Sequence, residues 1–461
     1  MKTELWQLSA SALAQLIRQR EASSREVVEA HLTRIEAVNP QLNAITVVLA
    51  ESAREAADLA DRTEPTGPLH GVPFTVKENI DCVGSATTDG LALRVDAMPA
   101  LDAPVVERMK AAGGIPLART NLPEMGLRVS TDNPLRGLTL NPWNAELTAG
   151  GSSGGEGSAL ASGMSPLGLG NDIGGSLRNP AFCCGIASLK PSPGRVPHAA
   201  CIDPTDGGIA FQVMAVHGPM ARHVEDLRLA YTVLSGRHFR DPESVDAPLR
   251  GPACKKRVAL VSELPGFDLP ESTGVALRRA GEALADQGFE IVDAAPPELE
   301  RVHEIWGLIL TMDFEPMLPE LAHVMSEGPL EMLRIICQKY PPSSVRLPDV
   351  HAERRRLSRL WSEFFQDFPI LISPTWTDRP FRHGADLEGV AGAELVSDRL
   401  RFITPANVLG LPAAAIPTGL HEGQPTGVQV YADRWREDLT LDAAEAIESA
   451  LGRITPVDPM A

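Results

Sequence analysis

Apolar and polar residues follow helical and strand periods in turn along the first third of the chain. From Ser23 to Val38 the apolar residues recur close to every 3.6 positions, and Ser23 and Glu26 have the spacing of a capping box. We therefore predict a helix that begins at Ser23. We expect Asn39-Pro40 to end it, because proline has no backbone N–H to donate.

Shorter apolar runs follow this helix. Residues 71–77 predict a buried strand that ends on the charged Lys77, residues 104–112 predict a helix, and residues 115–118 predict a further strand. Strands that alternate with helices in this way are typical of a layered α/β core.

The second half of the chain is less regular. The polar residues 236–256 predict a surface crossing, after which we expect a strand at 258–261, a helix at 272–287 and a strand at 289–292. Residues 301–340 mix Trp, Met, Leu and Ile with prolines and predict helices that either cap a site or belong to an ordinary core.

Composition narrows the class of protein. The chain has 461 residues, of which 43% are hydrophobic and 22% charged, as in globular proteins with a substantial interior. Its formal net charge of −18 repels phosphate groups, so we expect neither a nucleic acid nor an anionic membrane as a partner. No apolar run approaches the ~20 residues of a membrane span.

The six cysteines lack the CxxC spacing of a metal site, and the adjacent Cys183 and Cys184 would strain a mutual disulfide. We therefore expect free buried thiols and a reducing, cytoplasmic setting, without a metal or another cofactor.

Two glycine-rich stretches carry the candidate chemistry. They are Gly150-Gly151-Ser152-Ser153-Gly154-Gly155 and Ile173-Gly174-Gly175-Ser176. Neither has the spacing of a P-loop or of a dinucleotide-binding GxGxxG motif, so nucleotide binding is weakly supported. Around Ser176, successive N–H groups could converge where its hydroxyl attacks, which is the geometry that an acyl-transfer intermediate requires. A tight turn that binds no ligand is the alternative.

The first stretch also matches GxSxG, the nucleophile elbow of α/β-hydrolases, which would make Ser153 the nucleophile. That elbow follows an apolar strand, whereas residues 141–148 are polar and typical of turns, so we favour Ser176.

A serine nucleophile needs a base, and none of the eleven histidines stands in a setting that singles it out. Lysine is scarce, with seven against 35 arginines, yet Lys77 stands at the end of an apolar strand. Burial there would lower the pKa of its amine from ~10.4 towards neutrality. A neutral amine can act as a general base, whereas a guanidinium cannot. A surface lysine at a strand end is the alternative.

These stretches resemble the amidase signature family over nearly the whole chain. The resemblance is longest through residues 150–157 and 166–178. Similar elements occur at 71–79, 120–124, 182–185, 189–192, 218–222 and 427–430.

The resemblance implies a Ser-Ser-Lys triad. By motif position the nucleophile is Ser176, the bridging serine is Ser152, and the base is Lys77. The oxyanion would be held by the backbone N–H groups of Ile173, Gly174, Gly175 and Ser176.

Further residues are expected to support this triad. By family position Ser153 would support Ser152 through a hydrogen bond. We expect Asp172 and Arg178 to fix the loop, with an exposed salt bridge as the alternative, and we take Met125 and Gly126 as candidate substrate-binding residues.

The fold that the family implies is α/β, the amidase signature fold, with a large mixed, twisted β-sheet flanked by helices on both faces. We expect one domain over residues 1–461, with the lysine strand and catalytic core at about 70–226 and a substrate-entrance excursion at about 236–380. In that excursion Trp306, Met332 and Leu333 are candidates for an apolar acyl or aryl pocket, or are ordinary core residues.

The implied activity is hydrolysis of small to medium apolar or aryl amides through an acyl-enzyme, with carbamate (urethane) or ester cleavage as side activities. A glutaminase subunit of an amidotransferase and a catalytically inactive binding protein of the same fold are the alternatives. We expect a small-molecule amide or carbamate as the partner, and a monomer or a homodimer.

Overall fold

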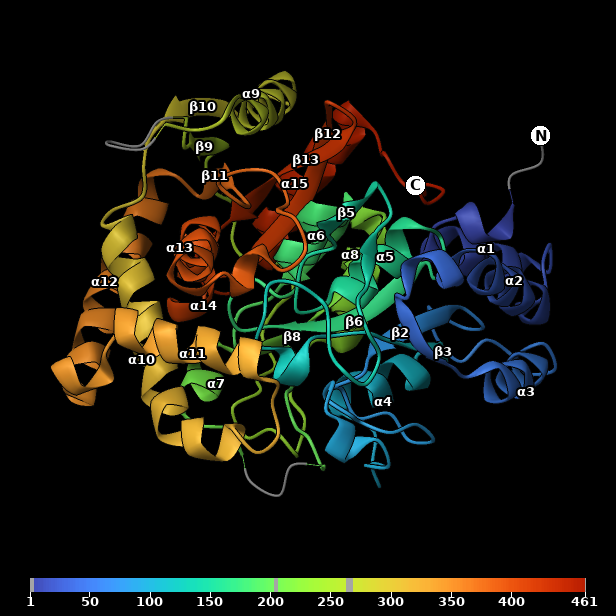
Figure 1. Ribbon diagram of the computed structural model, residues 1–461. Coiled ribbons are helices and arrows are strands. Elements are labelled where there is room, and N and C mark those ends of the chain that lie inside the picture. Colours follow the sequence, from blue (N-terminus) through green and yellow to red (C-terminus); the bar gives the residue numbers. More distant parts are fainter. Residues whose placement is uncertain (1–3, 203–205, 263–267, 461) are drawn as a thin grey trace.

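One mixed β-sheet forms the centre of the computed structural model, which describes residues 4–202, 206–262 and 268–460 (Figure 1). Its strands are β1 (Ile45–Val48), β2 (Pro73–Lys77), β3 (Ile115–Thr120), β6 (Leu167–Asp172), β7 (Ala187–Lys190), β8 (Val216–Ala221), β9 (Arg257–Leu260), β10 (Glu290–Asp293), β11 (Ile370–Pro374), β12 (Ala413–His421) and β13 (Gln424–Tyr431). Within the described residues these eleven strands lie in the order β1-β3-β2-β6-β8-β7-β12-β13-β11-β9-β10. β4 (Leu140–Asn141) and β5 (Asn144–Thr148) form a separate pair.

The sheet is mixed, as expected. β2 pairs in parallel with β3 and β6, and β9 pairs in parallel with β10 and β11. The other neighbouring strands of the large sheet are antiparallel.

Helices pack on both faces of this sheet. One face is covered by α1 (Ala10–Gln19), α4 (Pro104–Ala111), α8 (Val224–Leu234), α9 (Glu271–Asp286) and α15 (Glu437–Leu451). The other is covered by α5 (Gly154–Ala161), α6 (Arg178–Cys184), α7 (Ile209–Met214), α10 (Leu299–Leu321), α11 (Glu327–Lys339), α12 (Leu347–Asp367), α13 (Gly389–Leu400) and α14 (Thr404–Val408). α2 (Ser24–Leu42) and α3 (Ala50–Ala60) enclose a third apolar cluster with β1 and β3.

Figure 1 shows α10 to α14 gathered at one side of the molecule and α1 to α3 at the opposite side, with α9 beside β9 and β10 at one end of the sheet. The predicted layered α/β architecture is therefore confirmed.

Alternation along the strands explains why α5 lies so close to the sheet. In β6, Leu167 and Leu169 join the apolar cluster under α8 and α15, while Gly168 and Gly170 face α5. A Cβ at Gly168 would lie 1.8 Å from Glu156 Oε1 of α5, and one at Gly170 would lie 2.9 Å from Ser153 Oγ. Glycine at these two positions lets the serine-bearing segment approach the strand backbone.

The expected elements occur, with one difference at the end of α2. The helix begins after a capping box of Ser23 and Glu26, as predicted, but Pro40 does not end it, since α2 continues to Leu42. Pro40 lies in the last turn, where its missing N–H removes only one helical hydrogen bond. The helix ends at Asn43, which adopts the left-handed conformation and donates its N–H to Asn39 O.

The predicted excursion at 236–380 has two structurally different parts. Residues 257–293 supply β9, α9 and β10, which extend the sheet at its edge. Residues 299–339 form α10 and α11, so the prediction of helices over 301–340 is confirmed.

Candidate active site

The fold brings Lys77 and Ser152 into direct contact. Lys77 is the last residue of β2 and is fully buried. Its Nζ lies 2.7 Å from Ser152 Oγ and 2.6 Å from Asn171 Oδ1. Asn171 in turn donates its amide N–H to Asn79 Oδ1 at 3.0 Å, and this bond fixes the amide oxygen towards the lysine. The predicted lysine–serine pair is thus a buried hydrogen-bonded contact, and the surface-lysine alternative is wrong.

The environment of Lys77 favours the neutral amine. Burial lowers the pKa of Lys77 from its usual 10.5 to about 7, against the opposing attraction of Asp89, Asp172 and Glu156. Because Asn171 Oδ1 can only accept, the amine donates to it and keeps its lone pair for the Ser152 hydroxyl. A neutral lysine in this position can take a proton from Ser152.

The two glycine-rich stretches run side by side. Ser153 donates its backbone N–H to Ser176 O at 3.3 Å, and the Asn179 side chain donates to Gly151 O at 3.0 Å. Ser176 lies before α6 and keeps 7% of its surface exposed, whereas Ser153 is fully buried. A buried Ser153 is shielded from substrate, so the structure does not support the nucleophile-elbow alternative.

The predicted supporting role of the Ser153 hydroxyl is wrong. Ser153 Oγ is buried and makes no hydrogen bond within the described part of the chain. The reason is that Ser153 begins α5, and its Oγ faces Gly170 at the underside of the loop rather than Ser152. Only its backbone N–H contributes, by holding the carbonyl of Ser176.

Asp172 and Arg178 fix the loop between them, as expected. Arg178 donates to Asp172 Oδ2 at 3.0 Å and to Oδ1 at 3.1 Å, and both side chains are buried, so the exposed-salt-bridge alternative is wrong. Burial alone would raise the pKa of Asp172, but the Arg178 guanidinium holds it at about 2. The carboxylate also accepts the N–H groups of Gly175 at 2.7 Å and Leu177 at 3.2 Å.

These bonds correct the predicted oxyanion donors. The N–H of Gly175 is bound to Asp172 and does not face an incoming substrate. The N–H groups of Ile173, Gly174 and Ser176 donate to no other group among the described residues. Three of the four predicted donors are therefore free to bind a developing negative charge.

The candidate substrate-binding residues lie beside this cluster. Gly126 has a φ of +67°, and a Cβ there would lie 3.2 Å from Ser152 Oγ. Met125 is partly buried and packs against the main apolar cluster, in which Trp306, Met332 and Leu333 are buried. Of these three, Trp306 reaches the glycine-rich loop, since its Nε1 donates to Ile173 O at 3.0 Å.

Sequence reasoning missed several polar residues at the site. Asn79 and Asn171 complete the hydrogen bonds of Lys77, and Asn179 ties the two serine stretches together. Glu156 is fully buried, accepts a hydrogen bond from Thr120 Oγ1 at 2.7 Å and another from Thr75 Oγ1, and has its pKa raised to about 7 by burial. Only their place inside the glycine-rich motifs, or two residues after Lys77, could have pointed to them.

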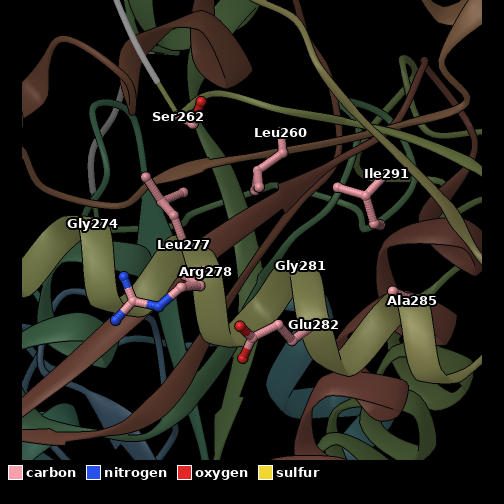
Figure 2. Close-up of a pocket in the computed structure, with 9 residues that line it drawn as sticks. All are labelled: Leu260, Ser262, Gly274, Leu277, Arg278, Gly281, Glu282, Ala285 and Ile291. Atoms are coloured by element: carbon pink, nitrogen blue, oxygen red, sulfur yellow. The ribbon is translucent and has the colours of Figure 1, made fainter.

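A separate cavity lies at the edge of the sheet, between α9 and strands β9 and β10 (Figure 2). It has a volume of about 490 Å³, and Leu260, Leu277 and Ile291 supply most of its apolar lining. It contains none of the serine or lysine residues discussed above, so it is not the catalytic pocket. Among the described residues, no group of three or more His, Cys, Asp or Glu side chains is arranged to hold a metal ion.

The geometry can be compared with known proteins. A sequence model of the family named Amidase matches residues 26–441. The chain belongs to the amidase signature family.

Its relatives and structural neighbours agree. The chain is 41% identical to an indoleacetamide hydrolase of Bradyrhizobium diazoefficiens, over 98% of this chain and 88% of that protein. It is 34% identical to an acylamidase of Rhodococcus erythropolis, over 96% and 95% of the two chains. The solved structure of 6-aminohexanoate cyclic dimer hydrolase with its substrate superimposes with a TM-score of 0.85 and 30% identity, over 99% of each chain. This amidase is accordingly a hydrolase of carbon–nitrogen bonds other than peptide bonds.

Proposed function

We propose that this amidase cleaves amides with Ser176 as the nucleophile, Ser152 as the proton bridge and Lys77 as the base. The observation that carries the proposal is the buried contact of 2.7 Å between Lys77 Nζ and Ser152 Oγ, at a lysine whose pKa is lowered to about 7. As Ser176 Oγ adds to the amide carbon, its proton passes to Ser152, and the proton of Ser152 passes to the neutral Lys77.

The negative charge that develops on the amide oxygen is held by the free N–H groups of Ile173, Gly174 and Ser176. The relay then runs in the opposite direction and protonates the leaving amine as the carbon–nitrogen bond breaks. Water adds to the acyl-enzyme with Lys77 again as the base, which releases the carboxylic acid and restores Ser176.

The substrate class follows from the relatives and from the apolar character of the surroundings. The relative at 41% identity is named an indoleacetamide hydrolase, and the one at 34% is named an acylamidase. Apolar, partly buried side chains flank the serine loops, among them Met125, Leu127 and Ile173. We propose primary amides of arylacetic acids, such as indole-3-acetamide, as preferred substrates, with carbamates and activated esters as side activities.

A substrate panel tests this proposal. Ammonia release is measured from indole-3-acetamide, acetamide, glutamine and an aryl carbamate, with product acids identified by mass spectrometry. We expect kcat/KM for indole-3-acetamide to exceed that for acetamide by at least about 100-fold, since burying an aryl group contributes several kcal/mol. Preferred turnover of glutamine would instead support an amidotransferase glutaminase, as in relatives at 31% identity. No turnover of any amide would support an inactive binding protein.

Setting and assembly are also proposals. The six cysteines are free thiols, and no helix among the described residues is long and apolar enough to cross a bilayer. We place the enzyme in a reducing cytoplasm. We propose that α10 and α11 form the wall of the substrate entrance, and that the enzyme acts on a small molecule as a monomer or a homodimer.

A further inference from the structure

The carbonyl groups of the nucleophile loop are all held by donors. Asn179 supplies two of these donors, because its side chain reaches Gly174 O at 3.5 Å and its backbone N–H reaches Gly175 O at 2.6 Å. The N–H of Ser153 holds Ser176 O, and Trp306 Nε1 holds Ile173 O at 3.0 Å. The loop is therefore oriented through its carbonyls, while its free N–H groups face the other way.

Only Trp306 reaches this loop from outside the glycine-rich core. It lies on α10, more than 120 residues along the chain from Ser176, and keeps 7% of its surface exposed. The indole lies directly against the loop, because a Cβ on Gly174 would stand 2.7 Å from Trp306 Cζ2. Any side chain at position 174 would displace the indole.

The bond to Ile173 O fixes more than a carbonyl. Within the described residues the cis peptide bonds are at Gly151-Ser152 and Thr455-Pro456, so the peptide between Ile173 and Gly174 is trans. In a trans peptide the C=O and the following N–H point in opposite directions. When Trp306 holds Ile173 O, it therefore turns the Gly174 N–H away from α10 and towards the side from which a substrate oxygen would approach.

The indole is itself held in place by a buried polar network. The His303 ring stacks on Trp306 with centroids 5.8 Å apart and planes within 10°. His303 Nδ1 lies 2.8 Å from Thr404 Oγ1, and its Nε2 lies 3.1 Å from both Ser397 Oγ and Tyr340 OH. Burial lowers the pKa of His303 to about 3, so the ring stays neutral and the network stays intact at working pH.

We propose that Trp306 is a positioning residue for the oxyanion site, which sets the direction of the Gly174 N–H through its hydrogen bond to Ile173 O. This inference rests on the proposed function, since it needs Ser176 chemistry to have a consequence. It also links α10, a wall of the proposed entrance, to the loop that stabilises the transition state. Trp306 thus acts on the reaction through Gly174 and without chemistry of its own.

Two substitutions separate the donor from the ring. Trp306→Phe keeps an aromatic ring and removes the N–H, and Trp306→Gln keeps an N–H four bonds from Cα, as in the indole, and removes the ring. The matched control is Trp361→Phe on α12, because Trp361 is also buried and its Nε1 also donates to a carbonyl, that of Pro297 at 2.9 Å.

Steady-state kinetics on the best amide of the substrate panel give the first readout. Loss of a whole oxyanion donor costs ~10²–10³ in rate, so misdirecting one should lower kcat by about 10- to 100-fold. We expect this loss for Trp306→Phe with KM changed by less than about threefold, a smaller loss for Trp306→Gln, and kcat near that of the wild type for Trp361→Phe. Thermal unfolding of each variant shows whether it is folded.

Phenylboronic acid gives the second readout. Ser176 Oγ adds to boron, its proton passes through Ser152 to Lys77, and the tetrahedral boronate places a negatively charged oxygen where the oxyanion forms. No group leaves. We expect its inhibition constant to rise in Trp306→Phe by the factor by which kcat/KM falls, because both depend on the same donors.

Other outcomes would overturn the inference. Unchanged kcat with a raised KM would make Trp306 only a wall of the substrate pocket. Equal losses in Trp306→Phe and Trp361→Phe would show a general effect of removing a buried indole, and a greater loss in Trp306→Gln than in Trp306→Phe would show that the ring matters rather than the donor. A wild-type enzyme without amide hydrolysis would overturn the proposed function itself, and this inference with it.

Discussion

Asn171 decides which atom of the lysine can take a proton. Its amide nitrogen is used by Asn79, so its oxygen must accept from Lys77, and the lone pair of the neutral amine is left for Ser152. Burial supplies the neutral form by lowering the pKa of Lys77 to about 7. The hydrogen-bond pattern and the electrostatics at this one residue thus favour the same direction of proton transfer.

The pH dependence of kcat/KM tests this assignment. The base is active when neutral, so we expect activity to fall below a pH of about 7, with a tenfold loss for each further pH unit. Lys190 is the matched control, since it is also fully buried and burial lowers its pKa to about 7. Lys190→Met should keep the ascending limb at the same pH, whatever its stability, and Lys77→Met should abolish turnover. A flat profile from pH 5 to 9 would contradict the role of Lys77.

At the scale of elements, the alternation of leucine and glycine in β6 determines how close α5 can come. The leucines fill the cluster on one face, and the glycines leave room on the other face for Glu156 and Ser153. Without this room the segment that carries Ser152 would stand further from β2 and from Lys77. The pattern that reads as a weak strand in the sequence is what brings the serine and the lysine together.

A pair of glycine substitutions tests this packing. In Gly168→Ala the new Cβ would overlap Glu156, so we expect unfolding to become easier by about 1–3 kcal/mol. In Gly274→Ala, within α9, nothing lies within 4 Å of the new Cβ, and the better helix propensity of alanine should stabilise by up to about 1 kcal/mol. Urea denaturation measures both. Equal effects of the two substitutions would contradict the close packing of α5 on β6.

Local patterns predicted the elements of this fold better than their ends. The strand to Lys77 and the helices over 301–340 occur where periodicity placed them, because their apolar residues face one cluster. The end of α2 differs, since the caps made by Asn39 and Asn43 outweigh the proline signal. Periodicity alone gave no strand order, and the large mixed sheet came from the family resemblance.

The candidate site was predictable where a motif names the residue. Resemblance placed Lys77 and Ser152 in one triad, and the structure brings these two side chains together across 75 positions. The commitment of the Gly175 N–H to Asp172 and the reach of Trp306 to the loop depend on backbone orientation and on packing between distant elements. No spacing of residue types encodes either of them.

At the scale of the whole molecule, burying Lys77 should make stability depend on pH. The unfolded lysine keeps its proton up to about pH 10.5, whereas the folded one loses it near 7, so unfolding takes up a proton between these values. In this window the wild type gains stability as pH rises, relative to a variant without the amine. The stability gap between Lys77→Met and the wild type should therefore shift towards the wild type by roughly 3 to 5 kcal/mol from pH 7 to 10.

Urea unfolding at several pH values measures this shift, with Lys255→Met as the control because Lys255 is exposed. We expect the control to follow the wild type at every pH. A gap between Lys77→Met and the wild type that stays constant from pH 7 to 10 would mean that the folded state does not lower the pKa of Lys77.

The central claim is that Ser176 is the nucleophile, and intact-protein mass spectrometry after treatment with a fluorophosphonate tests it most directly. The attacking serine oxygen forms a bond to phosphorus and fluoride leaves, so each labelled chain gains the mass of one phosphonyl group. We predict one adduct per chain in the wild type and in Ser153→Ala, and none in Ser176→Ala. Full labelling of Ser176→Ala, together with loss of labelling in Ser153→Ala, would contradict the account and make Ser153 the nucleophile.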